Sequence, residues 1–195
     1  MPASINIDID FDEFDGMFTT FEHTAWRLET RRAYRSDEET ETYRRFMQGR
    51  DAGYDLDDPW CTSRREQSAL GKRFERVRVL DNPPTPGQLY LLDGARRNAA
   101  VGEDIRHLWR SDAERLRLPA EDFWLFDSRV AALLHFDDAD RLTRVALITD
   151  PVKIVRYCQV RDAAWHDAVA TREFQAGLPS AAHSVDRPDS YRQEL

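Results

Sequence analysis

His135 is the side chain in this sequence whose type and setting best suit acid–base chemistry. It lies near the end of an apolar run at 130–136, and two aspartates follow within three residues. An imidazole beside carboxylates can act as a general base or a nucleophile. In that interpretation the chain is a phosphodiester or nucleotide hydrolase, with Asp127 in the site and Arg78 or Arg129 holding phosphate. The competing interpretation is a structural histidine whose hydrogen bonds are satisfied within the fold.

No sequence pattern marks a catalytic or cofactor site. The chain contains no G-x-x-x-x-G-K-[ST], G-x-G-x-x-G, G-x-S-x-G or H-E-x-x-H motif, so P-loop hydrolysis and zincin-type proteolysis are not indicated. The five histidines lack ligand spacing, and Cys61 and Cys158 show no paired spacing. We therefore expect no catalytic constellation, no cofactor, no metal site and no disulfide.

An acidic segment near the N-terminus is the main candidate for binding a partner. Residues 1–23 carry six acids and no lysine or arginine, and residues 11–21 place phenylalanines three to four positions apart. This spacing predicts a short helix with an apolar stripe and acids opposite it. The helix either packs on the domain or docks a basic protein partner. The docking candidates are Phe14, Phe18, Asp12, Glu13 and Asp15.

Tryptophans suggest a third type of function, the binding of a small ligand. A ligand sensor would need a pocket near Trp26, Trp60 or Trp124, because aromatic side chains commonly line such sites.

These side chains depend on a central stretch, residues 122–151, which predicts a strand, a hairpin and the start of a helix. The run at 130–136 is apolar at nearly every position, which is typical of a strand covered on both faces. The segment at 137–141 is rich in aspartates that bond their own backbone in turns. Asp150 and Pro151 then predict a helix N-cap and a first helical residue.

The rest of the chain predicts an α/β fold with a mixed sheet and helices on both faces. Ser36 and Glu39 have the spacing of a capping box for a helix that ends at Gly49, and residues 88–100 are expected to be helical up to Gly94. The alternation at 25–34 suggests a half-buried strand near a sheet edge, with its charged face in solvent. We expect strands near 25–33, 74–80, 103–109, 123–127, 129–136 and 142–148, and a long helix at 151–173.

Composition favours one domain over residues 1–177, followed by a flexible polar tail at 178–195. The N-terminus carries no cleavable apolar core and no run approaches the length of a membrane span, so we expect a cytoplasmic protein without a membrane partner. The net charge of −8 opposes direct nucleic-acid binding. The sequence does not define an oligomeric state.

Five segments carry a resemblance to a known family. These are HTAWRLET, RFERVRVLD, GEDIRHL, DFWLFDSRVAALLHFDD and DPVKIVRYCQVRDAAWHDAV. In this order they resemble an actinobacterial family catalogued as a domain of unknown function, over about residues 11 to 174. Members of such families are often encoded beside helix-turn-helix regulators, so the resemblance implies a regulatory setting.

A second resemblance concerns the fold. The order of LGKRFERVRVLD, GEDIRHL, DFWLFDSRVAALL and RDAAWHDAV is similar to one half of a phospholipase D-like domain. That superfamily carries H-x-K-x4-D. With its aspartate at Asp127, Ala120 takes the place of the histidine and Asp122 that of the lysine. The resemblance therefore implies a degenerate, catalytically inactive half domain.

Together these features favour a non-enzymatic, cytoplasmic regulatory or protein-interaction domain, with a DNA-binding regulator as the implied partner. A hydrolase of a phosphodiester or nucleotide and a small-ligand sensor remain as alternatives.

Overall fold

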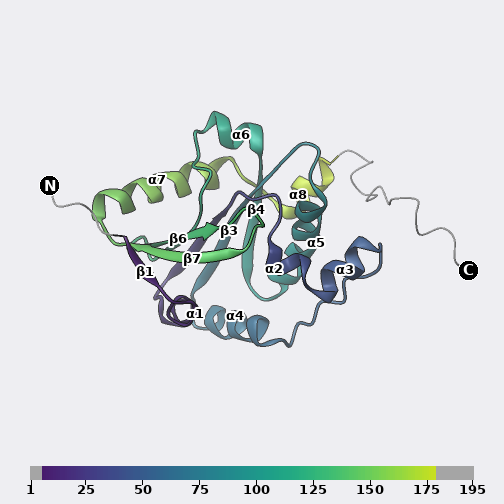
Figure 1. The fold of residues 1–195 in the computed structure, drawn as a ribbon, viewed down its shortest axis with the longest axis horizontal. Coiled ribbons are helices and arrows are strands. Elements are labelled where there is room, and N and C mark those ends of the chain that lie inside the picture. The colour runs from purple at the N-terminus through teal and green to yellow at the C-terminus, as the bar shows by residue number, and fades with distance from the viewer. Residues whose placement is uncertain (1–5, 179–195) are drawn as a thin grey trace, which may run out of the picture.

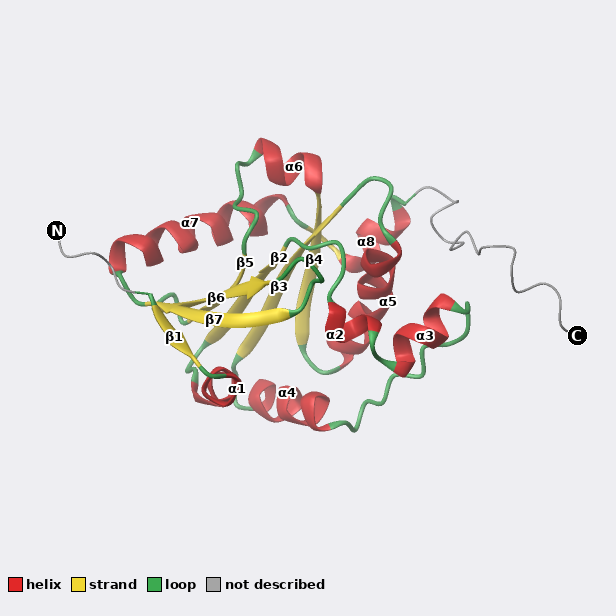
Figure 2. Ribbon diagram, viewed as in Figure 1, coloured by secondary structure: helices red, strands yellow, loops and turns green. Residues whose placement is uncertain are grey.

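The computed structural model describes residues 6–178, which form one mixed sheet with helices on both faces (Figures 1 and 2). The strands are β1 (Ile7–Ile9), β2 (Thr24–Glu29), β3 (Arg73–Leu80), β4 (Glu103–Trp109), β5 (Asp122–Phe126), β6 (Val130–Phe136), β7 (Leu142–Ile148) and β8 (Val169–Ala170). The helices are α1 (Phe11–Thr20), α2 (Arg35–Glu38), α3 (Glu41–Met47), α4 (Pro59–Ala69), α5 (Pro86–Ala100), α6 (Arg110–Arg115), α7 (Pro151–Asp167) and α8 (Thr171–Ala176). None of the described helices is both long and apolar enough to cross a membrane.

The strands lie in the order β1-β7-β6-β5-β2-β3-β4-β8. β2, β3 and β4 run parallel to one another, and every other neighbouring pair is antiparallel. Parallel strands need crossover connections, and here α4 and α5 lie in those connections. The predicted α/β class with a mixed sheet is therefore confirmed.

The predicted hairpin and helix start are also confirmed. One carboxylate oxygen of Asp137 accepts hydrogen bonds from the backbone N–H groups of Ala139 and Arg141, both at 2.9 Å, which fixes the turn between β6 and β7. Asp150 caps α7 by accepting from the N–H groups of Val152 and Lys153. These contacts are local, and local contacts are the ones that a sequence pattern predicts best.

The sheet separates two apolar cores. The α7-side core packs strand residues such as Leu28, Val77 and Phe123 under α6 and α7, and the α1-side core packs residues such as Phe74 and Phe126 under α1. Figure 1 shows α7 on one side of the sheet and α1 with α4 on the other. Because side chains alternate along a strand, β2 contributes to both faces.

β2 corrects one expectation from the sequence. It is the fifth strand of the sheet rather than a strand near the edge, and both of its faces are covered. Arg27 and Glu29 were expected on a solvated face, yet their side chains are 15% and 4% exposed. The alternation of charges along β2 therefore marks a buried polar layer.

Two helices differ from their predicted form. The single helix expected from a Ser36–Glu39 capping box is instead two short helices. The first ends at Glu38, and Thr40 is the N-cap of the second, α3. α5 continues past Gly94 to its true end six residues later, and a Cβ at Gly94 would lie 3.2 Å from the hydroxyl oxygen of Tyr54. Glycine at this position allows that close approach rather than ending the helix.

The C-terminal part also departs from the prediction of one helix over residues 151–173. α7 ends at Asp167, and the extended residues of β8 then pair with β4 at His107 and Arg106. Leu178, which was expected to begin the polar tail, is buried with Leu80. The rest of the predicted tail, 179–195, lies outside the described residues. Neither β1 nor β8 was predicted, because strands of two or three residues carry too little pattern.

Candidate functional site

The four residues of the hydrolase interpretation lie in separate places. His135 is near the end of β6, whereas Asp127 and Arg129 belong to the turn that precedes β6. Six strand residues span about 20 Å, so His135 and this turn are at opposite ends of the strand. Arg78 lies on β3, which is separated from β6 by two strands, β5 and β2. The structure therefore does not bring these four side chains together.

His135 lies next to Arg144 of β7. Partial burial lowers the pKa of His135, and the nearby Arg144 lowers it further. Its buried Nε2 atom has no hydrogen-bond partner among the described residues. Within residues 6–178 no group of three His, Cys, Asp or Glu side chains could hold a metal ion. Asp8 and Glu121 act on the pKa of His135 in the opposite direction, but no carboxylate of the described residues hydrogen-bonds to its ring or forms a salt bridge with it.

Asp127 is occupied by backbone groups. Its carboxylate accepts the N–H groups of Glu22, His23 and Thr24 at 2.8, 2.7 and 2.9 Å. Partial burial raises the pKa of Asp127, but these three hydrogen bonds outweigh that effect and lower it below its usual value. Arg129 is 73% exposed, with Glu22 at 3.7 Å. Asp127 thus fixes the entry of the chain into β2.

Arg78 belongs to a cluster that we name the buried charge network. It lies on the α1 side of the sheet and consists of Arg27, Glu29, Arg64, Arg76, Arg78, Glu103 and Asp122. The most exposed of these side chains is Arg27, at 15%. Arg78 pairs with Glu29 and donates to the backbone oxygen of Leu91, so its guanidinium is not free to hold a phosphate from solvent.

Two glutamates hold the network together. Glu29 lies 3.1 Å from Arg27 and 3.0 Å from Arg76, in addition to its pair with Arg78. Glu103 lies 2.9 Å from Arg76 and 3.4 Å from Arg64. Arg27 and Arg76 are direct neighbours across β2 and β3, so the carboxylate of Glu29 offsets the repulsion between them.

The ionisation of Glu29 depends on these neighbours. Burial alone raises the pKa of a carboxyl group, but Arg78, Arg27 and Arg76 together bring the pKa of Glu29 below its ordinary value. Glu29 is therefore charged in the folded protein. Removing one partner of such a buried group leaves an uncompensated charge and is strongly destabilising. The network is therefore a structural feature, although the sequence pattern of β2 predicted a charged face in solvent.

Asp122, the position that the phospholipase D resemblance assigns to a lysine, is part of this network. Its carboxylate accepts from the backbone N–H and the hydroxyl of Thr30, each at 2.8 Å, and from the hydroxyl of Tyr34. Arg27 lies 3.6 Å away. The carboxylate of Asp122 is therefore surrounded by hydrogen-bond donors.

The three tryptophans proposed as pocket markers divide between the two faces. Trp26 is buried in the α7-side core, whereas Trp124 lies in the α1-side core. The guanidinium of Arg76 lies 5.0 Å from the ring centre of Trp124 and 5.8 Å from that of Trp60. Trp60 and Trp124 thus enclose a buried arginine. None of the three tryptophans lines the groove between the sheet and α7, which is lined by Trp165 instead.

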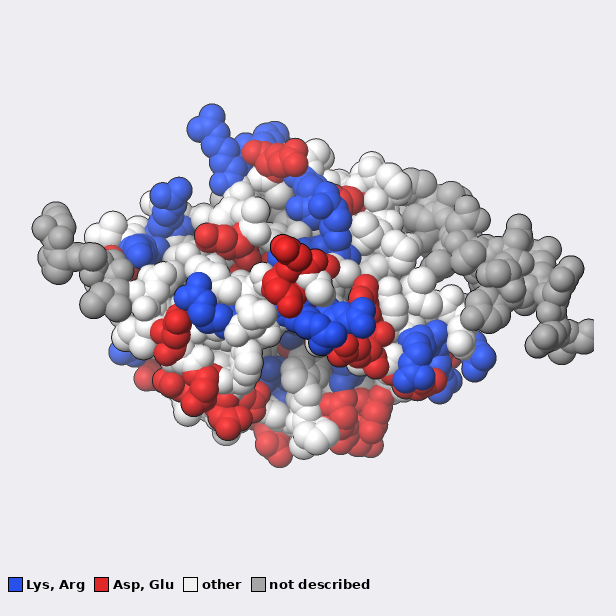
Figure 3. All heavy atoms as spheres, in the orientation of Figure 1, with Lys and Arg blue, Asp and Glu red and all other residues white. Residues whose placement is uncertain are grey.

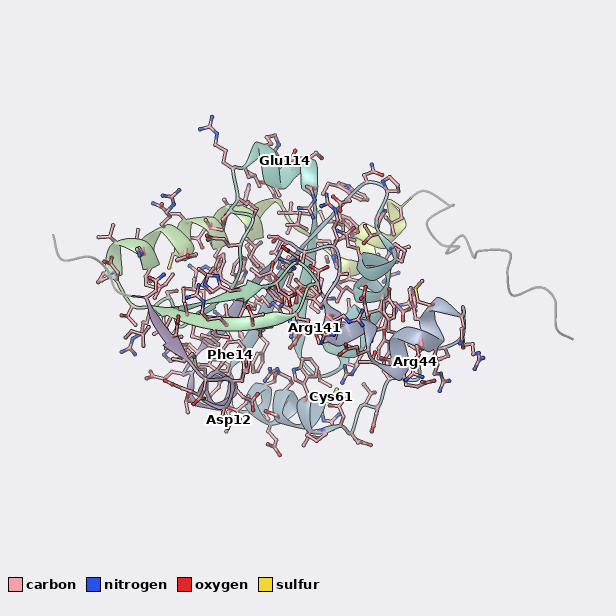
Figure 4. All side chains as sticks on the ribbon, in the orientation of Figure 1. Asp12, Phe14, Arg44, Cys61, Glu114 and Arg141 are labelled. Carbon is pink, nitrogen blue, oxygen red and sulfur yellow. The ribbon has the colours of Figure 1, made fainter. Side chains whose placement is uncertain are left out.

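Helix α1 separates its two kinds of side chain. Phe18 is buried, with its ring centre 4.8 Å from that of Trp124, and Phe14 is half-buried. Asp12, Glu13 and Asp15 are exposed. Figure 4 shows Asp12 on the outer side of α1 and Phe14 on the side toward the sheet. Phe18 is therefore a core residue rather than a docking residue, while the three acids face solvent as a docking surface requires.

A groove on the opposite side of the sheet was not predicted. The α7 groove has a volume of about 480 Å³ and is lined by Thr24, Arg73, Glu75, Arg161, Asp162, Trp165 and His166. The groove lies between the first residues of β2 and β3 and the C-terminal third of α7. The one signal in the sequence is the charged pair Arg161 and Asp162, which interrupts the apolar stripe of α7.

Comparison with family models places most of the chain in one family. Residues 12–176 match the model described as domain of unknown function (DUF6879). The resemblance to a family of unknown function is therefore confirmed, while its actinobacterial origin and its link to regulators stay predictions. No curated protein matches the sequence.

Solved structures with a similar fold include a phospholipase D family member, Nuc from Salmonella typhimurium. It is 9% identical, with a TM-score of 0.48 over 80% of this chain and 86% of that chain. NucT from Helicobacter pylori is 8% identical, with a TM-score of 0.47 over 85% of this chain and 97% of that one. TrmBL2, an archaeal chromatin protein, is 11% identical, with a TM-score of 0.42 over 81% and 49%.

Proposed function

The chain belongs to the family described as domain of unknown function DUF6879, and we propose that it is a non-enzymatic, cytoplasmic interaction domain with a regulatory role. In this proposal the exposed acids of α1 bind a basic surface of a protein partner. A DNA-binding regulator is the partner class that the family resemblance suggests, because such proteins carry basic surfaces.

The observation that carries the proposal is the outward acidic face of α1. Asp12, Glu13 and Asp15 are exposed, and no salt bridge joins them to the described residues. Figure 3 shows acidic groups gathered along the edge of the molecule that carries α1 and α4. Unpaired surface charge contributes little to folding but raises the rate at which an oppositely charged partner is met.

The helix is also held in a fixed orientation. Asp10 caps its N-terminus by accepting from the backbone N–H of Glu13 at 2.7 Å. At the other end, the ammonium group of Lys72 donates to the backbone oxygen of Thr19 and lies 4.8 Å from the ring centre of Phe21. A surface that is ordered before binding loses less entropy when a partner docks. The acids are therefore presented on a rigid support.

A capture experiment with three proteins tests this proposal. The full chain, the triple variant Asp12→Asn, Glu13→Gln, Asp15→Asn, and a control variant are immobilised and exposed to a lysate of the native host at low and moderate salt. The control neutralises three exposed acids elsewhere, Glu114→Gln, Asp138→Asn and Glu173→Gln, and so has the same net charge as the α1 variant. Asp10 stays unchanged because it is the N-cap.

We expect the full chain and the control to retain at least one basic protein that the α1 variant loses, with retention that weakens as salt rises. We expect all three proteins to share one melting temperature, because exposed charges contribute little to stability. The proposal is wrong if the three proteins retain the same set of partners. Loss of binding by the control as well would assign the effect to net charge rather than to α1.

A further inference from the structure

The α7 groove is a second surface with the dimensions of a binding site. Its volume of about 480 Å³ lies within the range of roughly 300 to 1,000 Å³ that small-molecule sites occupy. It is on the face of the sheet opposite α1, so an inference about it does not depend on the proposed docking of a protein partner. The chemistry of its lining limits the kind of ligand that fits.

The charged groups of the groove balance one another. On the β3 wall the guanidinium of Arg73 lies 3.3 Å from the carboxylate of Glu75. On the α7 wall Arg161 donates to Asp162 at 2.9 Å. Two arginines and two carboxylates give these four side chains no net charge. An anion attracted by the arginines is therefore repelled by the neighbouring carboxylates, and a cation meets the reverse situation.

The same pairs suit a ligand with hydroxyl groups. Each wall presents a hydrogen-bond donor directly beside an acceptor, and a hydroxyl can donate to one and accept from the other. Arg161 is held in place by a second hydrogen bond, at 2.7 Å, to the hydroxyl oxygen of Ser128. The hydroxyl of Thr24 makes no hydrogen bond to the described residues, and it adds one more donor and acceptor to the lining.

Trp165 gives the groove an apolar surface. The guanidinium of Arg106 lies 3.9 Å from its ring centre, which restrains the indole. A sugar ring has one face made of C–H groups, and such a face packs on an aromatic ring while the hydroxyls at its rim reach polar side chains. An aromatic ring in the same lining as two donor–acceptor pairs therefore matches a cyclic polyol better than a phosphate or an amino acid.

We propose that the α7 groove binds a neutral, polyhydroxylated ligand of the size of a mono- or disaccharide. Glu75 and Arg161 are largely withdrawn from solvent, with side-chain exposures of 20% and 24%. They make the orienting hydrogen bonds, and Trp165 packs on the ring of the ligand.

Nuclear magnetic resonance of the indole N–H groups tests the proposal on the full chain. Each of the five tryptophans has one indole N–H group, and the signal that disappears in Trp165→Phe is the one from the groove. Glucose, maltose and myo-inositol are titrated in turn, followed by inorganic phosphate and glycylglycine as a charged and a zwitterionic probe. We expect a saturable shift of the Trp165 signal with at least one polyol and with neither of the other probes.

Substitutions in the lining complete the test. We expect Glu75→Ala to weaken polyol binding about tenfold, the cost of losing a hydrogen bond to a charged group. Asp162→Ala, at an exposed position on α7, gives a second reading if Glu75→Ala does not fold, and Asp138→Ala far from the groove serves as the control. The proposal is overturned if no polyol shifts the signal, if phosphate or glycylglycine binds more tightly, or if the lining variants bind as the control does.

Discussion

At the scale of single residues, two of the polar side chains that suggested catalysis, Asp127 and Arg78, hold the fold together. Asp127 closes a loop through three backbone hydrogen bonds, and Arg78 neutralises a buried glutamate. Both roles depend on groups about 50 to 105 positions away in the chain. A sequence pattern shows the residue type but not its distant partner, so the same aspartate or arginine fits a catalytic and a structural interpretation equally well.

His107 is a buried histidine whose protonation state follows from its contacts. The hydroxyl of Thr171 donates to the backbone oxygen of Ile105, so it accepts from Nε2–H of His107 at 3.0 Å. The Nδ1 atom is then the unprotonated nitrogen, and it has no hydrogen-bond partner among the described residues. Burial, and next Arg78, lower the pKa of His107 to about 3. His107 is therefore neutral in the folded protein at ordinary pH.

This difference in proton binding predicts a dependence of stability on pH. The unfolded chain protonates His107 near pH 6.5, whereas the folded protein does so only near pH 3. The stability is fully present above pH 6.5 and is lost as the pH falls toward 3, because the unfolded state binds the extra proton. Between about pH 6 and 4.5 we expect a loss of about 2 kcal/mol from this one group.

Urea unfolding of the native chain and of His107→Gln across this interval measures the effect. Glutamine keeps a donor for Thr171 but does not titrate, so we expect its stability to fall less steeply with acid. His135→Gln is the comparison: its pKa is lowered too, but it is less buried than His107, so its share should be smaller. Parallel curves for the native chain and His107→Gln would contradict the assigned protonation state.

At the scale of elements, prediction succeeded where the signal is local. The hairpin of β6 and β7 and the start of α7 each depend on an aspartate that bonds the next few backbone groups. The position of β2 could not be predicted, because burial of Arg27 and Glu29 depends on β3 and on the helices that cover them. The α7 groove is equally non-local, since it joins residues near 24, 73 and 161.

Helix α1 combines a structural side with an exposed side, and two phenylalanines distinguish them. Phe18 is buried against Trp124 and Phe126, whereas Phe11 is 51% exposed. We expect Phe18→Ala to lower the free energy of unfolding by about 3 to 5 kcal/mol, because it opens a cavity in the α1-side core. For Phe11→Ala we expect a change within about 0.5 kcal/mol.

Urea titrations of both variants, followed by circular dichroism, measure these free energies. The comparison also bears on docking, because Phe11 is available to a partner and Phe18 is not. Equal destabilisation by the two substitutions would mean that α1 does not pack on the sheet as described.

At the scale of the whole molecule, one sheet separates two apolar cores, and the buried charge network lies on its α1 side. β2 contributes to all three: Leu28 to the α7-side core, Ala25 to the α1-side core, and Arg27 with Glu29 to the network. The ion pairs of Glu29 and Glu103 connect β2, β3, β4 and α4. Separation of the α1-side helices from the sheet would break these ion pairs and leave charges unpaired. A state in which only the sheet or only these helices stay folded is therefore unfavourable.

This arrangement predicts a single cooperative unfolding transition. Tryptophan fluorescence reports on both cores, through Trp26 on one face and Trp124 on the other, and far-ultraviolet circular dichroism reports on the whole backbone. In urea we expect the two signals to change together, with one midpoint. Leu28→Ala in the α7-side core and Phe74→Leu in the α1-side core should each lower that shared midpoint rather than divide the transition.

A Trp26→Phe variant provides the contradicting outcome, because its fluorescence reports more on the α1 side. If that fluorescence changes at a lower urea concentration than the backbone signal, the helices over the charge network form a separate unit. The network would then be a local contact between layers instead of the connection that makes the sheet and its helices unfold as one.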